Sequence, residues 1–118
     1  MGKFVFKTVA SGFKFDLKAG NGEVIATSEV YTTKAACIKG IQSILTAVPK
    51  APVVAEGESV PNPKFETFRD KKGQYRFRLR SRNGKIIAIS VAHMTAYGCS
   101  RAIASIRECI PTATIEEQ

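Results

Sequence analysis

The second half of this chain repeats the first, and that repeat constrains the fold more than any other feature. When the chain is shifted by 62 positions, Phe15 aligns with Phe77. Self-similarity at one fixed spacing indicates a duplicated structural unit, so both copies must satisfy the same plan. The identical pairs, aligned from Phe6 onward without a gap, include Phe6 with Phe68, Leu17 with Leu79, Asn21-Gly22 with Asn83-Gly84, Ile25-Ala26 with Ile87-Ala88, Ser28 with Ser90, Thr33 with Thr95, Cys37 with Cys99, Ile41 with Ile103 and Pro49 with Pro111.

The clearest local pattern is the alternation of apolar and basic residues over residues 75–80. A β-strand sends successive side chains to opposite faces, so Tyr75, Phe77 and Leu79 share one face and the three arginines between them share the other. Asn83 and Gly84 follow, and Asn-Gly favours the type I′ turn of a β-hairpin. The first copy has the same pattern at 13–18 and 21–22. We therefore expect a strand with one buried face and one solvent-exposed, basic face.

Each copy continues with a third strand and then an amphipathic helix. Thr33 (or Thr32) and Thr95 are suited to cap the helices, and prolines end both of them. The apolar stripe of the first helix recurs in the second, while Lys39, Gln42 and Thr46 fall on its outer side. The expected strands lie near 4–7, 13–18, 23–28 and 51–54, and near 65–69, 75–80, 85–91 and 113–115.

The plan of each copy is therefore β-β-β-α-β. We assign residues 1–55 to the first repeat, 56–63 to a polar, Pro-containing linker and 64–118 to the second repeat. About 50 residues bury too little core to fold comfortably alone. We expect an α+β fold in which the repeats share one mainly antiparallel sheet and both helices cover the same face. An antiparallel sheet can leave its other face in water, as the arginines require.

Three linked patterns resemble the YegP-like family of small bacterial proteins, and the resemblance covers nearly the whole chain. They are Phe-x-x-Phe-Arg-Asp-Lys-Lys-Gly-Gln-Tyr-Arg-Phe-Arg-Leu at 65–79, Asn-Gly-Glu-Val-Ile-Ala-Thr-Ser-Glu at 21–29 and Lys-Ala-Ala-Cys-x-x-Gly-Ile-x-Ser at 34–43. The resemblance implies that the last strand of each repeat crosses to the other half, and that single-repeat members reach the same arrangement as dimers. It implies no established activity and no catalytic residues. The second repeat departs from the pattern at 91–94, where Val-Ala-His-Met stands in place of Glu-Val-Tyr-Thr.

The net charge of the chain is +8, and it is unevenly distributed. Residues 1–61 carry seven lysines against five acidic residues, whereas residues 62–118 carry eleven Lys and Arg against five. Such a balance suits a polyanion ligand, but it is also an ordinary route to solubility. The candidate polyanion-binding residues, listed by their place on the alternating strands, are Lys14, Lys18, Arg76, Arg78, Arg80 and Arg82. The alternative is a solvated face whose arginines only protect the sheet.

The composition also bears on the cellular compartment of the protein and on the metal or cofactor sites that it could form. No run approaches the roughly 18 apolar residues of a membrane span, and the N-terminus does not resemble a secretory signal, so we expect a cytoplasmic protein. Cys37, Cys99 and Cys109 then read as reduced thiols, with Cys109 the one least tied to the fold. His93 is expected in the helix-cap region or on the surface, and Gly40 marks close helix packing. We predict no metal site and no cofactor.

The sequence does not name a partner. It favours a non-enzymatic module of unknown biochemical role, monomeric because the pseudo-twofold interface is internal. The alternative is RNA or DNA binding through the arginine strand. The aromatic residues on the opposite face of that strand weaken an interpretation based on base stacking. An enzyme would need a pocket of converging polar groups between the repeats.

Overall fold

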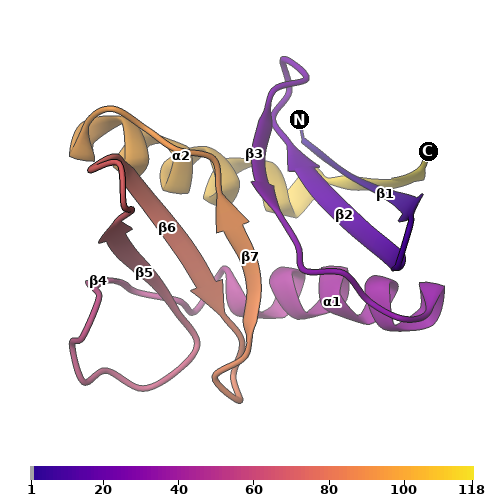
Figure 1. Ribbon diagram of the computed structural model, residues 1–118, viewed down its shortest axis with the longest axis horizontal. Coiled ribbons are helices and arrows are strands. Elements are labelled where there is room, and N and C mark those ends of the chain that lie inside the picture. The colour runs from indigo at the N-terminus through magenta and orange to yellow at the C-terminus, as the bar shows by residue number, and fades with distance from the viewer. Residues whose placement is uncertain (1) are drawn as a thin grey trace.

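The computed structural model describes residues 2–118 as one open eight-stranded sheet with two helices against one face (Figure 1). The mixed α+β class expected from the sequence is confirmed. The strands are β1 (Lys3–Val9), β2 (Gly12–Lys18), β3 (Val24–Thr27), β4 (Val53–Ala55), β5 (Lys64–Arg69), β6 (Tyr75–Arg80), β7 (Ile86–Ser90) and β8 (Thr114–Glu117). The helices are α1 (Lys34–Ala47) and α2 (Ala96–Cys109), and a 3₁₀ turn (Ile110–Thr112) follows α2.

The strand order is β4-β5-β6-β7-β3-β2-β1-β8. Within each half the first three strands pair antiparallel, but the last strand does not stay with its own half. Instead, β4 pairs parallel with β5, and β8 pairs parallel with β1. The halves also meet at the centre, where β3 and β7 pair antiparallel. Each half therefore supplies an outermost strand to the other.

Both helices lie behind the sheet in the view of Figure 1, and they cover a single core. The inward side chains of β2 and β6, among them Phe15 and Phe77, are buried in this core together with the apolar stripe of each helix. Cys37 and Cys99 occupy equivalent places in those stripes and are both buried. The core is continuous across the two halves, which overcomes the small size of each repeat.

Equivalent aromatic pairs show how closely the halves correspond. The rings of Phe4 and Phe15 meet edge to face with centroids 5.9 Å apart, and those of Phe65 and Phe77 do so at 5.7 Å. The angle between the ring planes is 72° in both pairs. The equivalent of Phe4 is therefore Phe65, 61 positions later and not 62.

The ungapped alignment of Phe6 with Phe68 is consequently wrong, because the turn that follows the first strand is one residue longer in the second half. Thr8 pairs with Phe13 around residues 9–12, whereas Arg69 pairs with Tyr75, the equivalent of Phe13, around residues 70–74. Asp70 stabilises the longer turn, since its Oδ1 accepts from the backbone N–H groups of residues 72 and 74 (2.9 and 3.0 Å). An Asp side chain that accepts from backbone amides further along the chain is typical of tight turns, and here it accommodates the extra residue of the second half.

A buried serine ends the β-ladder in each half. The backbone N–H of Phe15 donates to Ser28 Oγ, and that of Phe77 donates to Ser90 Oγ, both at 2.9 Å. Each hydroxyl in turn donates to the carbonyl of the next residue (2.8 and 2.9 Å). The serine satisfies an amide that would otherwise be buried without a partner as the chain leaves the sheet.

The helix boundaries follow the expected signals. The side chains of Thr33 and Thr95 accept from the amide three residues on, at 3.1 and 3.0 Å. Thr33, and not Thr32, is therefore the cap of α1. Each helix is capped at its C-terminal end by the residue before the proline, as expected for a residue type that cannot continue the hydrogen-bond ladder.

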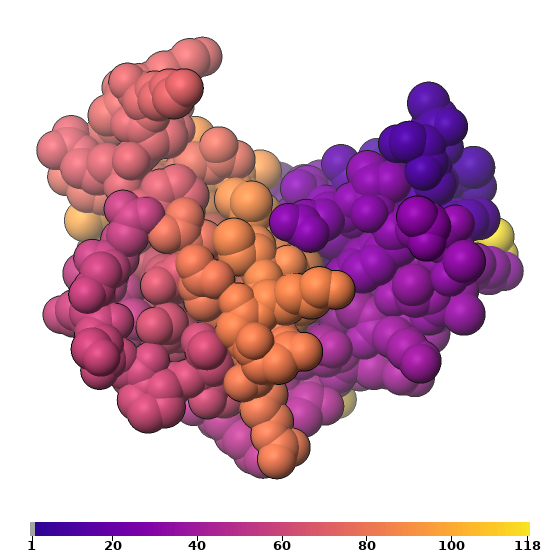
Figure 2. Space-filling model, turned by 60° about the horizontal axis from the view of Figure 1, so that its bottom comes forward, coloured from indigo at the N-terminus to yellow at the C-terminus, as the bar shows by residue number. Residues whose placement is uncertain are grey.

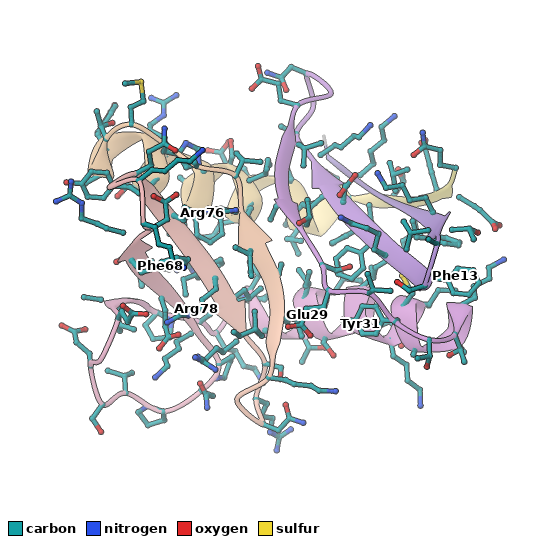
Figure 3. All side chains as sticks on the ribbon, in the orientation of Figure 1. Phe13, Glu29, Tyr31, Phe68, Arg76 and Arg78 are labelled. Atoms are coloured by element: carbon teal, nitrogen blue, oxygen red, sulfur yellow. The ribbon has the colours of Figure 1, made fainter. Side chains whose placement is uncertain are left out.

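Gly40 is buried in α1, but its close neighbour is a side chain and not another helix. A Cβ atom at this position would overlap Oη of Tyr31 and lie 3.2 Å from the ring of Phe15. Figure 3 labels Tyr31 where the chain passes from β3 to α1. The glycine makes room for the phenol, and the equivalent pair in the second half is Ala102 with His93.

Candidate polyanion-binding surface

The arginines of β6 lie on the outer face of the sheet, away from the helices. Figure 3 shows Arg76 and Arg78 on this side, next to Phe68 of β5. The residues between them point the other way, since Phe77 is 0% and Leu79 2% exposed in the core. The alternation read from the sequence is thus the observed one.

These arginines are occupied by partners within the protein. Arg78 and Arg80 donate through Nε to the same Oε1 of Glu66, at 2.8 and 2.6 Å. Arg76 donates through Nε and Nη2 to the carbonyl of Ser90, at 3.1 and 2.9 Å. Two nitrogens of each guanidinium are therefore already engaged within the protein, which leaves fewer donors for a phosphate.

Glu66 is the centre of this arrangement, and it is only 5% exposed. Burial by itself raises the pKa of Glu66, but hydrogen bonds from Arg78 and Arg80 and their positive charges outweigh it, so the pKa lies below its usual value. Arg78 also forms an ion pair with Glu56, which follows β4, and its guanidinium lies 4.6 Å from the centroid of the Phe68 ring. The segment 56–63 is thereby tied to the outer face.

The remaining candidates on the outer face are far from this cluster. Lys14 and Lys18 belong to β2, and β7 and β3 lie between β2 and β6. Three strand spacings amount to about 14 Å. Neither lysine forms an ion pair with any residue from 2 to 118. The six candidate residues therefore do not form one patch.

Arg82 departs from the outer face and lines a groove of about 750 Å³. One wall is α1 and the turn after it, and the other is the β6–β7 turn, which projects at the lower edge in Figure 2. The wall of α1 contributes Lys39, Thr46 and Lys50, and the wall of the turn contributes Ser81, Arg82 and Asn83. The groove thus lies between the helix of the first half and the hairpin of the second.

The charge of this groove has one sign. Its lining contains Lys39, Lys50 and Arg82 but no Asp, Glu, His or Cys. All three cations are exposed, and none forms an ion pair within the described part of the chain. The helical spacing of the sequence predicts that Lys39 and Thr46 lie on the outer side of the helix, but no local pattern indicates that the hairpin of the other half faces them.

The pseudo-equivalent position in the other half is different. A smaller pocket of about 240 Å³ lies there, lined among others by Asn21, Glu23 and Arg101. Arg82 is replaced by Gly20, and Lys50 by Thr112. The cationic groove is therefore not duplicated.

The cysteines and the histidine form no site of their own. The three cysteines are free, and burial raises the pKa of Cys37 and Cys99 above that of an ordinary thiol. Cys109, the cysteine that the sequence ties least to the fold, is also buried, at 7% exposed. His93 pairs through its backbone with Tyr75, and its Nε2 is buried without a hydrogen-bond partner. Residues 2–118 contain no cluster of three potential metal ligands among His, Cys, Asp and Glu.

Two β-β-β-α-β units in one sheet, with their last strands exchanged, define a small class of α+β tandem-repeat proteins. The chain belongs to the family described as "Domain of unknown function (DUF1508)", which matches residues 9–54 and again 70–117. The resemblance inferred from the sequence is confirmed.

Relatives of known sequence or structure support this assignment. The UPF0339 protein YegP of Escherichia coli O157:H7 is 34% identical over 111 residues, which cover 94% of this chain and 91% of that protein. A UPF0339 protein of Treponema denticola is 52% identical over 54 residues, 45% of this chain but 93% of that protein, so it has the length of one repeat. The solution structures of yegP from E. coli and of SO3888 from Shewanella oneidensis superpose with TM-scores of 0.82 and 0.81 at 32% identity. They cover 99% and 98% of this chain, which covers 92% and 90% of theirs.

Neither helix in residues 2–118 combines the length and apolar character that crossing a membrane requires.

Proposed function

We propose that this protein is a monomeric, cytosolic binding module with no chemistry of its own, and that it binds RNA or DNA through lysine and arginine side chains. The observation that carries the proposal is the groove between the halves, where Lys39, Lys50 and Arg82 converge without a carboxylate. Three cations that form no ion pair among residues 2–118 favour a ligand that carries several negative charges.

The same groove favours binding over catalysis. It occupies the place between the repeats where a site shared by both halves would be expected. However, its lining offers no carboxylate, imidazole or thiol to act as a general acid, base or nucleophile near neutral pH. Its hydroxyl and amide groups, from Ser43, Thr46, Gln42 and Asn83, are suited to hydrogen-bond phosphate oxygens.

The arginine strand plays a smaller part in this proposal than the sequence suggested. Arg78 and Arg80 are held by Glu66, and Arg78 also by Glu56, so a phosphate would have to displace these carboxylates. Lys14 and Lys18 remain as secondary contacts that a longer strand could reach across the outer face.

Filter binding with labelled single-stranded RNA and DNA tests the proposal. We expect retention at low salt that weakens steeply as salt is added, because binding to phosphates releases counterions. A basic protein of similar size and net charge serves as the control for purely non-specific retention. No retention of either nucleic acid at low salt would refute the proposed function.

A further inference from the structure

We propose that the groove between α1 and the β6–β7 turn binds a linear run of about four phosphates, laid along α1 and recognised through its backbone alone. This inference rests on the proposed function and specifies its site, the length of chain bound and the absence of base recognition. It moves the binding site from the arginine strand, where the sequence placed it, to a surface that both halves build together.

The spacing of cations along α1 sets the length of the ligand. Lys39 and Thr46 are seven residues apart, which is about 10 Å along a helix, and Lys50 lies about one further turn away. The chain keeps a helical path beyond the end of α1, since Val48 has helical dihedral angles and the N–H of Lys50 donates to the carbonyl of Ala47 (3.1 Å). Positive charge therefore stands at both ends of a row of about 15 Å. Successive phosphates of a stacked strand rise by about 3.4 Å, so the row accommodates about four of them.

The opposite wall holds the third cation at a defined place. The β6–β7 turn is fixed by the hydrogen bond from the N–H of Ser81 to the carbonyl of Lys85 (2.8 Å) and by a side-chain bond between Ser81 and Asn83. Arg80 also donates to the carbonyl of Gly84 (2.8 Å). Arg82 lies at the tip of this turn, where its guanidinium can bind a phosphate in bidentate fashion.

The lining residues also exclude other modes of binding. No aromatic side chain lines the groove, so bases have no platform to stack on. A volume of about 750 Å³ lies in the range of small-molecule sites, too small for a duplex. The ligand that fits the groove is therefore a single chain of phosphates, which either a nucleic-acid strand or linear polyphosphate could supply.

The second half of the chain is an internal comparison. At the positions equivalent to Arg82, Lys50 and Thr46 stand Gly20, Thr112 and Glu108. Compared with the groove, the pseudo-equivalent surface therefore lacks two cations and carries an additional carboxylate. We therefore assign one phosphate-binding groove per chain and not two.

The experiment measures fluorescence anisotropy of the full chain with labelled single-stranded oligonucleotides of about six nucleotides, as uridylate and as adenylate, and with labelled linear polyphosphate of similar length. If the three cations neutralise three phosphates of a single strand, the slope of log affinity against log salt concentration is about −2. The affinity then falls about 20-fold between 50 and 200 mM salt. We expect uridylate and adenylate to bind equally within about twofold, because bases are not stacked.

The test variant is Lys39→Gln/Lys50→Gln/Arg82→Gln, and the charge-matched control is Lys71→Gln/Lys72→Gln/Arg101→Gln, three exposed cations outside the groove. Far-UV circular dichroism confirms that both variants are folded. The groove variant is expected to lose this slope and at least about 20-fold in affinity at low salt, whereas the control retains most of both. Thr46→Glu, which copies the other half, should also weaken binding at least threefold.

The possible outcomes separate the two proposals. If the wild-type chain binds neither oligonucleotides nor polyphosphate, both fail. If it binds oligonucleotides but the two triple variants weaken equally, the function stands and the groove assignment is refuted. Binding of polyphosphate alone, lost in the groove variant, upholds the groove and refutes the nucleic-acid function. A duplex that binds more tightly than single strands, or a strong preference between uridylate and adenylate, refutes backbone recognition in the groove.

Discussion

Glu66 illustrates how a single buried carboxylate can set the behaviour of a basic surface. It lies 2.8 and 2.6 Å from the Nε atoms of Arg78 and Arg80, and the Nζ of Lys64 is 3.7 Å from its other oxygen. Three cations thus surround one acid that is almost fully removed from solvent. A buried charge is tolerated only with such partners, so Glu66 and the arginines depend on one another.

We predict that Glu66→Gln lowers the free energy of unfolding by about 3–5 kcal/mol at neutral pH, because it leaves the partly buried arginines without a counter-charge. Because the pKa of Glu66 is lowered on folding, its contribution is present above the unfolded pKa of about 4.3 and is lost as pH falls through the folded pKa. The stability difference between the wild type and Glu66→Gln should therefore shrink below about pH 4. Urea unfolding at a series of pH values measures it.

The exposed Glu29→Gln is the control, with an effect within about 0.5 kcal/mol at every pH. A Glu66→Gln chain as stable as the wild type at neutral pH would show that the arginine cluster does not stabilise the fold.

A second residue-scale prediction concerns the contact of Gly40 with Tyr31. Gly40→Ala adds a methyl group that overlaps the phenol oxygen, and overpacking of this kind costs about 1–3 kcal/mol. The gain in helix propensity, about 1 kcal/mol, offsets only part of this cost. The double variant Gly40→Ala/Tyr31→His copies the pair found at Ala102 and His93, and should be more stable than Gly40→Ala alone. A double-mutant cycle from chemical denaturation gives the coupling; additive effects would contradict this explanation.

At the scale of elements, each half relies on one serine where the third strand leaves the sheet. Ser90→Ala removes the acceptor for the buried N–H of Phe77, and an unsatisfied buried donor costs about 1–3 kcal/mol. Ser28→Ala should have a similar effect, because its hydrogen bond has the same length. Equilibrium unfolding measures both changes. The exposed Ser59→Ala is the control and should be neutral; if Ser90→Ala is equally neutral, the hydroxyl does not hold the end of the ladder.

At the scale of the whole molecule, the exchange of β4 and β8 joins the halves more firmly than the central pair of strands does. Only Ala26 with Ser90 and Thr27 with Ile89 are paired between β3 and β7. In contrast, both outer strands and the continuous core cross from one half to the other. Each half therefore loses its outermost strand if the other unfolds.

We therefore predict a single cooperative unfolding transition. Circular dichroism and tyrosine fluorescence, which sums Tyr31 of the first half with Tyr75 and Tyr97 of the second, should give coincident curves. Phe15→Leu and Phe77→Leu, one in each half, should each move the whole curve to lower denaturant. Two separate transitions, or a variant that shifts only one probe, would show that the halves fold independently.

Much of the fold follows from local patterns. The alternation at 75–80, the turn residues Asn83 and Gly84 and the cap Thr95 act over a few neighbouring positions, so their structural outcome could be predicted from them. The correspondence between the first strands of the two repeats could not be predicted in this way. One extra residue in the turn after Arg69 shifts the alignment by one position, yet an identical pair of residues remains in the incorrect alignment. The repeat itself was the strongest indication of a shared sheet.

The sequence by itself determined the strands, the helices and the family, and it also determined which residues of β6 are buried and which face solvent. Only the tertiary structure decided which cations are available. Arg78 and Arg80 meet Glu66 across a strand pair, and Arg82 faces Lys39 and Lys50 across a groove between the two halves. The physical reason is range: side-chain alternation and capping depend on neighbours in the chain, whereas the partner of a charge depends on residues brought near it by the fold, here from the other repeat.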